Sequence, residues 1–312
     1  MRQPTRGDYP PGFSLLPDGG DAALNMRAAT IVNAIAVFSL RRGGCSPPPF
    51  DSLNFSINEG DTPENVRANL SLLSGHLLLD PARIAFARQV HGSAIEVLES
   101  VPRIAPTADA LATAVPGLFL AVKTADCLPI LLLDPARRVV AAVHAGWNGT
   151  RRRIVRNVVR MMKSEFRSDP SDLLVFLGPA IGSCCYEVGE TVLVPFRREF
   201  PGADSFIVSL GQRENADPFQ RHNPADPIAE SSEFLRARGL EPRPLTATRE
   251  ASKSFRLNLV GANRAELRRE GIPENHIFAT NLCTACYPDL FFSHRRDHGR
   301  TGRHIAIVGF RP

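Results

Sequence analysis

The sequence predicts an α+β fold. Short apolar runs have the length and composition of buried strands, and helix signals lie between them without the regular strand–helix alternation of a doubly wound sheet. The chain has 312 residues, of which 43% are hydrophobic and 22% charged, as is usual for a globular protein. The predicted strands are Thr30–Phe38, Ile84–Phe86, Ala94–Leu98, Gly117–Val122, Leu128–Leu133, Val139–Val143, Leu173–Leu177, His276–Ala279 and His304–Phe310.

Helix signals mark four segments. Thr62 as N-cap and Pro63 as first helical residue open one of them. Another opens at Asp226-Pro227 and ends at Gly239, and a third covers roughly Leu257 to Glu270. In the fourth, an apolar stripe runs from Ile154 to Phe166, and we interpret its arginines (151, 152, 153, 156 and 160) as the solvated face rather than a nucleic-acid site.

We expect one domain over residues 28–312, with a polar insertion near 209–227 and a loose N-terminal extension at 1–27. The apolar run Ala28–Leu40 is only 13 residues long, whereas a membrane span needs about 20. We therefore expect no membrane partner and a cytoplasmic protein, either monomer or homodimer. The net charge of +5 suits anionic small molecules as well as nucleic acid.

Three residues have the side chains that hold zinc: His91, Cys127 and His144. Catalytic zinc takes three protein ligands and leaves a position for water or substrate. If the chain reverses between Pro135 and Ala136, Cys127 lies directly across a hairpin from His144, with Cβ atoms roughly 5 Å apart. One metal ion can bridge that gap, and His91 must arrive from elsewhere in the fold.

A series of ordered motifs carries a family resemblance, from about Ile31 to Phe310. The chain resembles the laccase-domain family, also catalogued as polyphenol oxidase and as purine nucleoside phosphorylase. The resemblance implies a mixed-sheet sandwich flanked by helices, distantly similar to cytotoxic necrotizing factor toxins, and it implies the same three metal ligands. The motifs are Arg42-Gly43-Gly44-Cys45-Ser46, Ser52-Leu53-Asn54, Gly60-Asp61, Gln89-Val90-His91-Gly92, Ala108-Asp109-Ala110, Thr124-Ala125-Asp126-Cys127-Leu128-Pro129, His144-Ala145-Gly146-Trp147, Gly178-Pro179-Ala180-Ile181-Gly182, Tyr186-Glu187-Val188-Gly189, Cys283-Thr284, Phe291-Phe292-Ser293, Arg295-Arg296-Asp297 and Thr301-Gly302-Arg303.

This resemblance implies phosphorolysis of adenosine, inosine and methylthioadenosine, with adenosine deamination as a second activity. Purine nucleoside and phosphate are then the partners. The expected catalytic residues are Asp126, Cys127 and His144, where Asp126 is either a proton carrier or support for the metal. A loop rich in arginine suits phosphate. The expected substrate-binding residues are Asn54, Glu187, Ser293, Arg295 and Arg303.

Other functions stay open. A copper oxidase needs several coppers held mainly by imidazoles, but the chain has eight histidines and no His-x-His pair, so copper is less favoured than zinc. A hydrolase that edits misplaced L-Ser in cell-wall precursors is an alternative, as is a non-catalytic binding module. The deaminase signature His-x-Glu followed by Pro-Cys-x-x-Cys is absent.

Several residues have two interpretations. Cys184 and Cys185 fit packing better than a nucleophile, and Cys283-x-x-Cys286 fits half of a zinc site or a redox pair. Trp147 either stacks on a base or anchors the core. The chain also departs from the family pattern at Asn148, where Arg is usual, and at His294, where Tyr is common; the segment from Ser209 to Phe255 is longer than in typical members.

Overall fold

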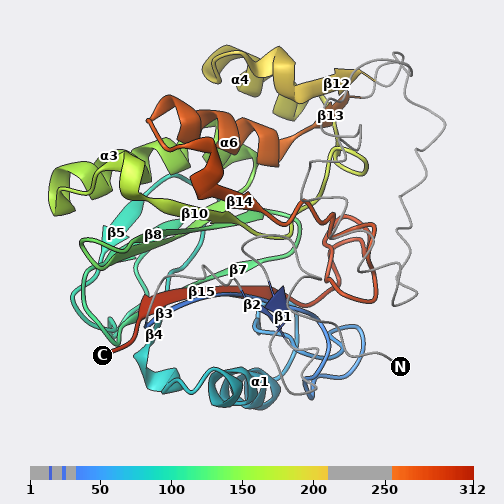
Figure 1. The fold of residues 1–312 in the computed structure, drawn as a ribbon. Helices are drawn as coiled ribbons and strands as arrows, with labels where there is room; N and C mark the ends of the chain where they lie inside the picture. The colour runs from blue at the N-terminus through green and yellow to red at the C-terminus, as the bar shows by residue number, and fades with distance from the viewer. Residues whose placement is uncertain (1–13, 16–22, 26–32, 210–254) are drawn as a thin grey trace, which may run out of the picture.

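The structure is a computed structural model, and it describes residues 14–15, 23–25, 33–209 and 255–312. Two six-stranded mixed sheets are stacked on each other, with helices on both outer faces (Figure 1). The prediction of an α+β fold with mixed sheets is confirmed.

The first sheet is built around the last strand of the chain. Strand β15 pairs antiparallel with β3 on one side and with β7 on the other, and only β4 runs parallel to its neighbour. The order of strands is β1 (Ser14–Leu15), β2 (Ala23–Asn25), β3 (Ala34–Ser39), β15 (His304–Phe310), β7 (Phe119–Thr124) and β4 (Ile84–Phe86).

The second sheet has a long hairpin at its centre and parallel pairs at both edges. Its order is β14 (Ile277–Ala279), β10 (Leu174–Leu177), β8 (Leu128–Asp134), β9 (Val139–Ala145), β6 (Ala110–Thr113) and β5 (Ile95–Val97). A small antiparallel sheet lies apart, in the order β11 (Glu187–Val188), β13 (Phe255–Leu257) and β12 (Ile207–Ser209). The 3-10 turns are η1 (Pro81–Arg83), η2 (Pro170–Asp172), η3 (Ala203–Phe206) and η4 (Glu274–His276).

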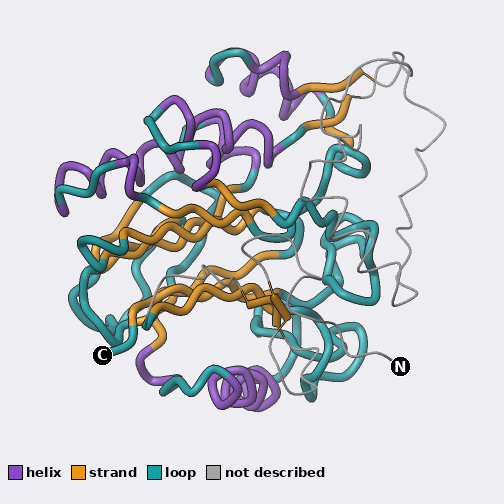
Figure 2. The backbone as a smooth tube through the Cα atoms, in the orientation of Figure 1, coloured by secondary structure: helices purple, strands orange, loops and turns teal. Residues whose placement is uncertain are grey.

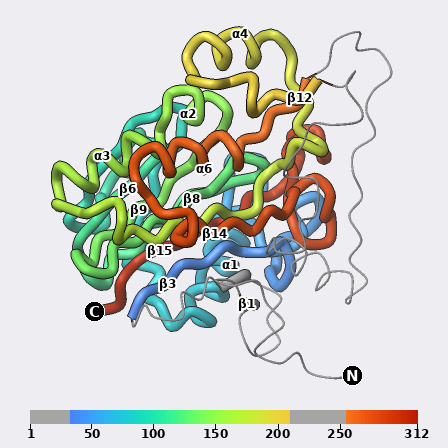
Figure 3. The backbone as a smooth tube through the Cα atoms, turned by 45° about the horizontal axis from the view of Figure 1, so that its top comes forward, coloured from blue at the N-terminus to red at the C-terminus, as the bar shows by residue number. Residues whose placement is uncertain are grey.

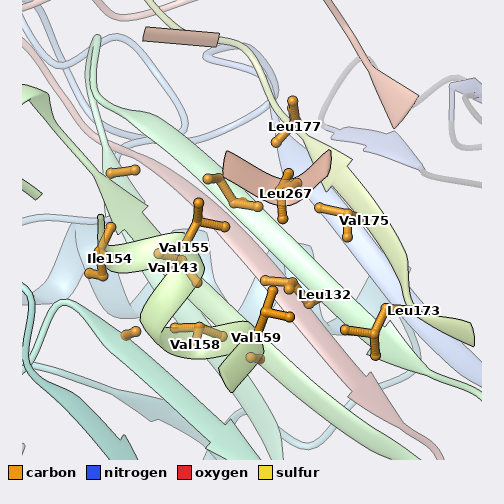
Figure 4. Packing of buried hydrophobic residues seen from close by; sticks show 14 of the residues in the cluster. Leu132, Val143, Ile154, Val155, Val158, Val159, Leu173, Val175, Leu177 and Leu267 are labelled. Atoms are coloured by element: carbon orange, nitrogen blue, oxygen red, sulfur yellow. The ribbon is translucent and has the colours of Figure 1, made fainter. Parts of the chain in front are cut away.

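The buried hairpin explains the layered core, because successive strand residues point to opposite faces. On β8, Leu131 and Leu133 pack between the two sheets, in a cluster that includes Phe38 and Val308 of the first sheet. Leu132 faces the other way and packs under the helices (Figure 4). Helices α3 (Ile154–Phe166) and α6 (Leu259–Arg269) lie side by side on that face (Figures 1 and 3).

The arginine-rich face of α3 is not simply solvated, because some of its arginines form ion pairs with acidic side chains. Arg160 forms an ion pair with Glu270 at 2.9 Å. Arg153 lies 3.6 Å from Glu266, which belongs to α6. Two further helices, α2 (Trp147–Arg151) and α4 (Glu190–Glu199), extend this layer, and Arg151 pairs with Glu199 between them. These acidic partners disfavour the patch as a nucleic-acid site.

Helix α1 (Pro63–His76) covers the outer face of the first sheet (Figure 1). Its predicted start is confirmed, because the Thr62 side chain accepts a hydrogen bond from the Asn65 N–H and Pro63 follows it. Buried Leu73 packs in the cluster that contains Ala121 and Ile307 of the sheet.

The predicted hairpin is confirmed, but its predicted register is wrong by two residues. Asp134 pairs with Val139, so four residues form the turn, and Pro129 rather than Cys127 lies opposite His144. Because side chains alternate with a period of two, this shift leaves Cys127 on the same face as His144, as a diagonal neighbour.

Some elements were not predicted, namely β6, β11, β12, β13, α2 and α4. The extension predicted as loose at 1–27 contributes β1 and β2, and β2 pairs with β3; its other residues lie outside the described ones. The expected helix from Asp226 to Gly239 and the insertion at 209–227, except Ser209, also lie outside them. Among the described residues, no helix has the length and apolar character needed to cross a membrane.

Candidate metal centre

His91, Cys127 and His144 come together in space from three separate segments of the chain. Figure 2 shows that loops gather at one end of the two sheets. His91 lies in the loop between β4 and β5, Cys127 precedes β8, and His144 is on β9. Their ligand atoms lie within 4.8 Å of one another, and Cys127 Sγ is 3.9 Å from His91 Nδ1. The triad predicted from sequence is therefore a geometric cluster.

Asp109 fixes two of the three triad residues. His144 Nδ1 lies 2.8 Å from Asp109 Oδ1, which leaves the other ring nitrogen for a metal. The same carboxylate accepts hydrogen bonds from the backbone N–H groups of Val90, His91 and Gly92 at 3.2, 2.9 and 2.7 Å. These bonds hold His91 in a left-handed conformation, with φ of 56°. A carboxylate that orients a ligating imidazole in this way also raises its basicity.

The charges of the triad are mutually stabilising. Burial by itself would raise the pKa of the Cys127 thiol, but the attraction of His144 and the hydrogen bonds from both histidines lower that pKa to about 6. Burial would likewise lower the pKa of His144, yet Cys127 and Asp109 raise it to about 9. The thiolate form that binds metal is thus favoured near neutral pH, where a metal ion can replace the imidazolium proton.

Backbone support comes from the start of α2. Gly146 is its N-cap, and a Cβ atom added there would lie 2.9 Å from Cys127 Sγ and 3.4 Å from His91 Nδ1. Asn148 donates a hydrogen bond to the His91 carbonyl and accepts one from Arg151. Asn148, where the family pattern has Arg, therefore supports the loop that carries His91.

Asp126 connects the triad to the C-terminal loop. Its oxygens accept hydrogen bonds from Thr284 Oγ1 and from the Arg295 N–H, both at 2.6 Å, and its carbonyl accepts one from Ile181. The residue has a φ of 84°, in the left-handed region that L-residues seldom adopt. Burial raises the pKa of its carboxyl group. Donors that occupy both oxygens favour a supporting role for Asp126 over proton transfer.

A pocket of about 560 Å³ opens from the triad, and its walls carry four basic side chains, Arg88, Lys123, Arg295 and Arg303. The acids Glu59 and Asp126 also line the pocket, and Glu59 pairs with Arg303 at 2.6 Å. Burial lowers the pKa of Lys123, an effect that Glu59 partly offsets. Tyr186 lines the same pocket, with the Arg295 guanidinium 5.2 Å from its ring centroid. The pocket thus combines a metal-binding triad with an anion-attracting wall.

Comparison with known proteins identifies the family. The family model described as multi-copper polyphenol oxidoreductase laccase matches residues 35–244 and 228–311. The chain belongs to this family. The predicted resemblance is therefore confirmed.

Curated relatives of this laccase family match most of the chain. The protein is 38% identical over 275 residues to purine nucleoside phosphorylase YfiH of Escherichia coli, covering 88% of this chain and 92% of the relative. It is 32% identical over 297 residues to purine nucleoside phosphorylase YlmD of Geobacillus stearothermophilus, covering 92% and 94%. The crystal structure of YlmD from Geobacillus stearothermophilus superposes with a TM-score of 0.77 at 30% identity, covering 97% of this chain and all of that one. The crystal structure of the Bacillus licheniformis hypothetical protein YfiH superposes with a TM-score of 0.76 at 31% identity, covering 96% of this chain and 99% of that one.

The structure separates the expected substrate residues into two groups. Arg295 and Arg303 line the pocket together with Asp126 and the triad. Three others do not line it: Asn54 and Glu187 support arginines that do, and Ser293 supports Arg296, which does not. Fully buried Asn54 accepts a hydrogen bond from the Arg303 N–H, Ser293 Oγ accepts one from Arg296, and the Glu187 carbonyl accepts one from Arg295. Arg296 binds Asp297 and two backbone carbonyls, so it holds the loop together.

Two residues at the site, Asp109 and Lys123, had no role in the predictions from sequence. Asp109 stands in the motif Ala108-Asp109-Ala110, where a fully buried acid just before a strand requires several hydrogen-bond donors. Lys123 is a lone charge in the apolar strand β7, which signals a functional exception. Trp147 does not line the pocket but packs against the cluster around α4, which supports its interpretation as an anchor.

Replacing Gly146 by alanine is expected to weaken metal binding at the triad, because the new methyl group would displace Cys127 or His91. Overpacking of this kind costs about 1–3 kcal/mol, which corresponds to a loss of about 5- to 150-fold in affinity. Chelator competition measures the effect. Gly189→Ala is the matched control, since Gly189 is also an extended N-cap glycine and an added Cβ would meet no atom within 4 Å. Equal zinc affinity in the two variants would contradict the close contact.

Proposed function

We propose that the protein is a zinc-dependent purine nucleoside phosphorylase that acts on adenosine, inosine and methylthioadenosine. The observation that carries the proposal is the pocket that joins a His₂Cys triad to a wall of basic side chains. Curated relatives with 32–38% identity over most of the chain are named for this activity. A volume of about 560 Å³ suits a small-molecule substrate, since ligand pockets span roughly 300–1,000 Å³.

The donor set of the triad fits zinc. Two imidazoles and one thiolate are ligands that zinc accepts, and three protein ligands leave a position open. The multi-copper oxidation named in the family description would require further imidazole ligands. Among the described residues, the groups with metal-binding geometry are this triad and a cluster of cysteines. Zinc bound at such a site polarises a substrate oxygen or lowers the pKa of a water molecule.

Phosphate is the second substrate that the pocket suits. Arg295, Arg303 and Lys123 can place charge-assisted hydrogen bonds on its oxygens and orient it for attack on ribose C1′. The bond between C1′ and the purine nitrogen breaks as the bond to phosphate forms, and the departing purine takes a proton. Tyr186 offers a ring to the substrate, and burial raises the pKa of its hydroxyl, which therefore stays a hydrogen-bond donor.

The test is incubation with inosine in the presence and absence of inorganic phosphate, with both products measured. We expect hypoxanthine and ribose 1-phosphate in equal amounts, and only when phosphate is added. Release of hypoxanthine with free ribose and no phosphate dependence would contradict the proposal. Relatives named for phosphorolysis do not favour the cell-wall hydrolase or the polyphenol oxidase.

Adenosine deamination is part of the proposal as a second activity of the same centre. A metal held by His91, Cys127 and His144 would supply the activation of water that deamination at C6 of adenine requires. Adenosine without phosphate should then yield inosine and ammonia. Adenosine that stays unchanged without phosphate would remove this second activity and leave phosphorolysis intact.

Replacing Lys123 by methionine is expected to raise the KM for phosphate roughly tenfold or more, because a hydrogen bond to a charged group is worth about 1.5–3 kcal/mol. The KM for inosine should change less. In the native protein, the KM for phosphate should also rise with pH as Lys123 loses its proton. This loss should occur at a lower pH than for an ordinary lysine, because the pKa of Lys123 is lowered from the usual 10.5. Lys163→Met, at an exposed site on α3, is the control. An unchanged phosphate KM would exclude Lys123 from the anion site.

A further inference from the structure

Four cysteines from two distant segments form a second cluster. The sulfur atoms of Cys184, Cys185, Cys283 and Cys286 lie within 4.8 Å of one another. Cys286 Sγ is 3.5 Å from both Cys184 Sγ and Cys185 Sγ. The sequence offers no second pair with the Cys-x-x-Cys spacing, but the fold supplies the missing half from two adjacent cysteines.

We propose that these four cysteines bind a structural zinc ion, in addition to the metal of the His₂Cys triad. Tetrahedral zinc with four thiolates has Zn–S distances of about 2.3 Å, which places the sulfurs roughly 3.8 Å apart. The two separations from Cys286 Sγ, 3.5 Å each, are close to this value, and all four sulfurs lie within 4.8 Å of one another. They are far longer than a covalent S–S bond of about 2.05 Å. The six cysteines all lie in described segments and form no disulfide.

The surroundings favour a structural rather than a catalytic metal. Cys185, Cys283 and Cys286 are 5%, 7% and 3% exposed, and they pack in the apolar cluster around α4. Four protein ligands leave no position for substrate, as in structural zinc sites.

The backbone is shaped around the sulfur atoms. The Gly182 N–H donates to Cys283 Sγ at 3.2 Å, a bond that stabilises a thiolate. A Cβ atom added at Gly182 would lie 3.1 Å from Cys184 Sγ and 3.3 Å from Cys283 Cβ. A tight turn, in which the N–H groups of Cys185 and Tyr186 both bond to the Gly182 carbonyl, brings the adjacent cysteines to the same side.

The zinc ion would join two loops that support the first metal centre. Ala180 and Cys283 form a β-bridge, and both loops reach Asp126: Ile181 through its N–H and Thr284 through its hydroxyl. Asp126 adjoins the ligand Cys127. The second metal would therefore hold in place the loops that position the triad and Arg295.

Native mass spectrometry and elemental analysis of the purified chain test the proposal without substrate. We expect about two zinc ions per native chain and about one in both Cys283→Ser/Cys286→Ser and His144→Ala. Cys45→Ser, at an exposed cysteine outside both clusters, should keep both ions.

His144→Ala keeps the test decisive if the double cysteine variant fails to fold. One zinc ion in the native chain that is lost in His144→Ala would overturn the proposal. Disulfides among the four cysteines, or iron in place of zinc, would do so as well. Because zinc content is measured without inosine or phosphate, an absence of phosphorolysis has no bearing on this result.

Discussion

Replacing His144 by alanine is expected to lower kcat/KM for inosine phosphorolysis about 1,000-fold. In the proposed zinc centre the side chain supplies one of three metal ligands, and a bound metal contributes several kcal/mol of transition-state stabilisation. A loss of about 4 kcal/mol corresponds to a factor of about 1,000 in rate. His144 is 3% exposed, so the variant also removes a buried hydrogen bond to Asp109.

Two controls separate this effect from misfolding. His76→Ala removes an exposed histidine from the last turn of α1 and should retain full activity. The thermal midpoint of His144→Ala shows whether the chain stays folded. A folded His144→Ala variant with native kcat/KM would contradict a catalytic metal at this position.

Replacing Asp109 by asparagine is expected to lower zinc affinity at the triad 10- to 100-fold, the usual effect of losing a carboxylate behind a ligating imidazole. The carboxylate accepts hydrogen bonds from three backbone N–H groups and from His144. An amide has the same size, but its NH₂ group must face some of these donors. The loop that carries His91 should therefore loosen, and the free energy of unfolding should fall by about 1–3 kcal/mol for a donor left unpaired.

Chelator competition gives the zinc affinity of Asp109→Asn, and urea unfolding gives its stability. Asp289→Asn is the matched control, because Asp289 is a half-exposed carboxylate paired with Arg42. Native affinity in Asp109→Asn would show that the carboxylate does not orient His144 for metal binding.

Strands were predictable where the sequence is most apolar. β4 and β15 have the predicted bounds, because each is bounded by clear breaks and is largely buried. The register of the hairpin between β8 and β9 was not predictable from the sequence. The turn residues at 134–138 allow more than one reversal point, and pairing across the sheet decides between them. The small strands β11 and β13 carry weak patterns of their own and form through tertiary pairing.

The cluster of His91, Cys127 and His144 was predictable because its combination of side chains is rare, whereas the wall of the pocket was not. Lys123 and Glu59 reach the pocket from segments 64 positions apart in the chain, and no local pattern joins them. Asn54 shows the opposite case: its amide suits a substrate, but the fold uses it to hold Arg303. The sulfur cluster likewise depends on two loops about 100 residues apart.

The most direct test of a zinc centre that serves phosphorolysis is a zinc titration of metal-free protein. The rate of ribose 1-phosphate formation from inosine and phosphate is measured as zinc is added back. We expect negligible activity without metal, a rise with added zinc to the native rate, and no recovery in His144→Ala. Full phosphorolytic activity in the metal-free protein would contradict the central role given to His91, Cys127 and His144.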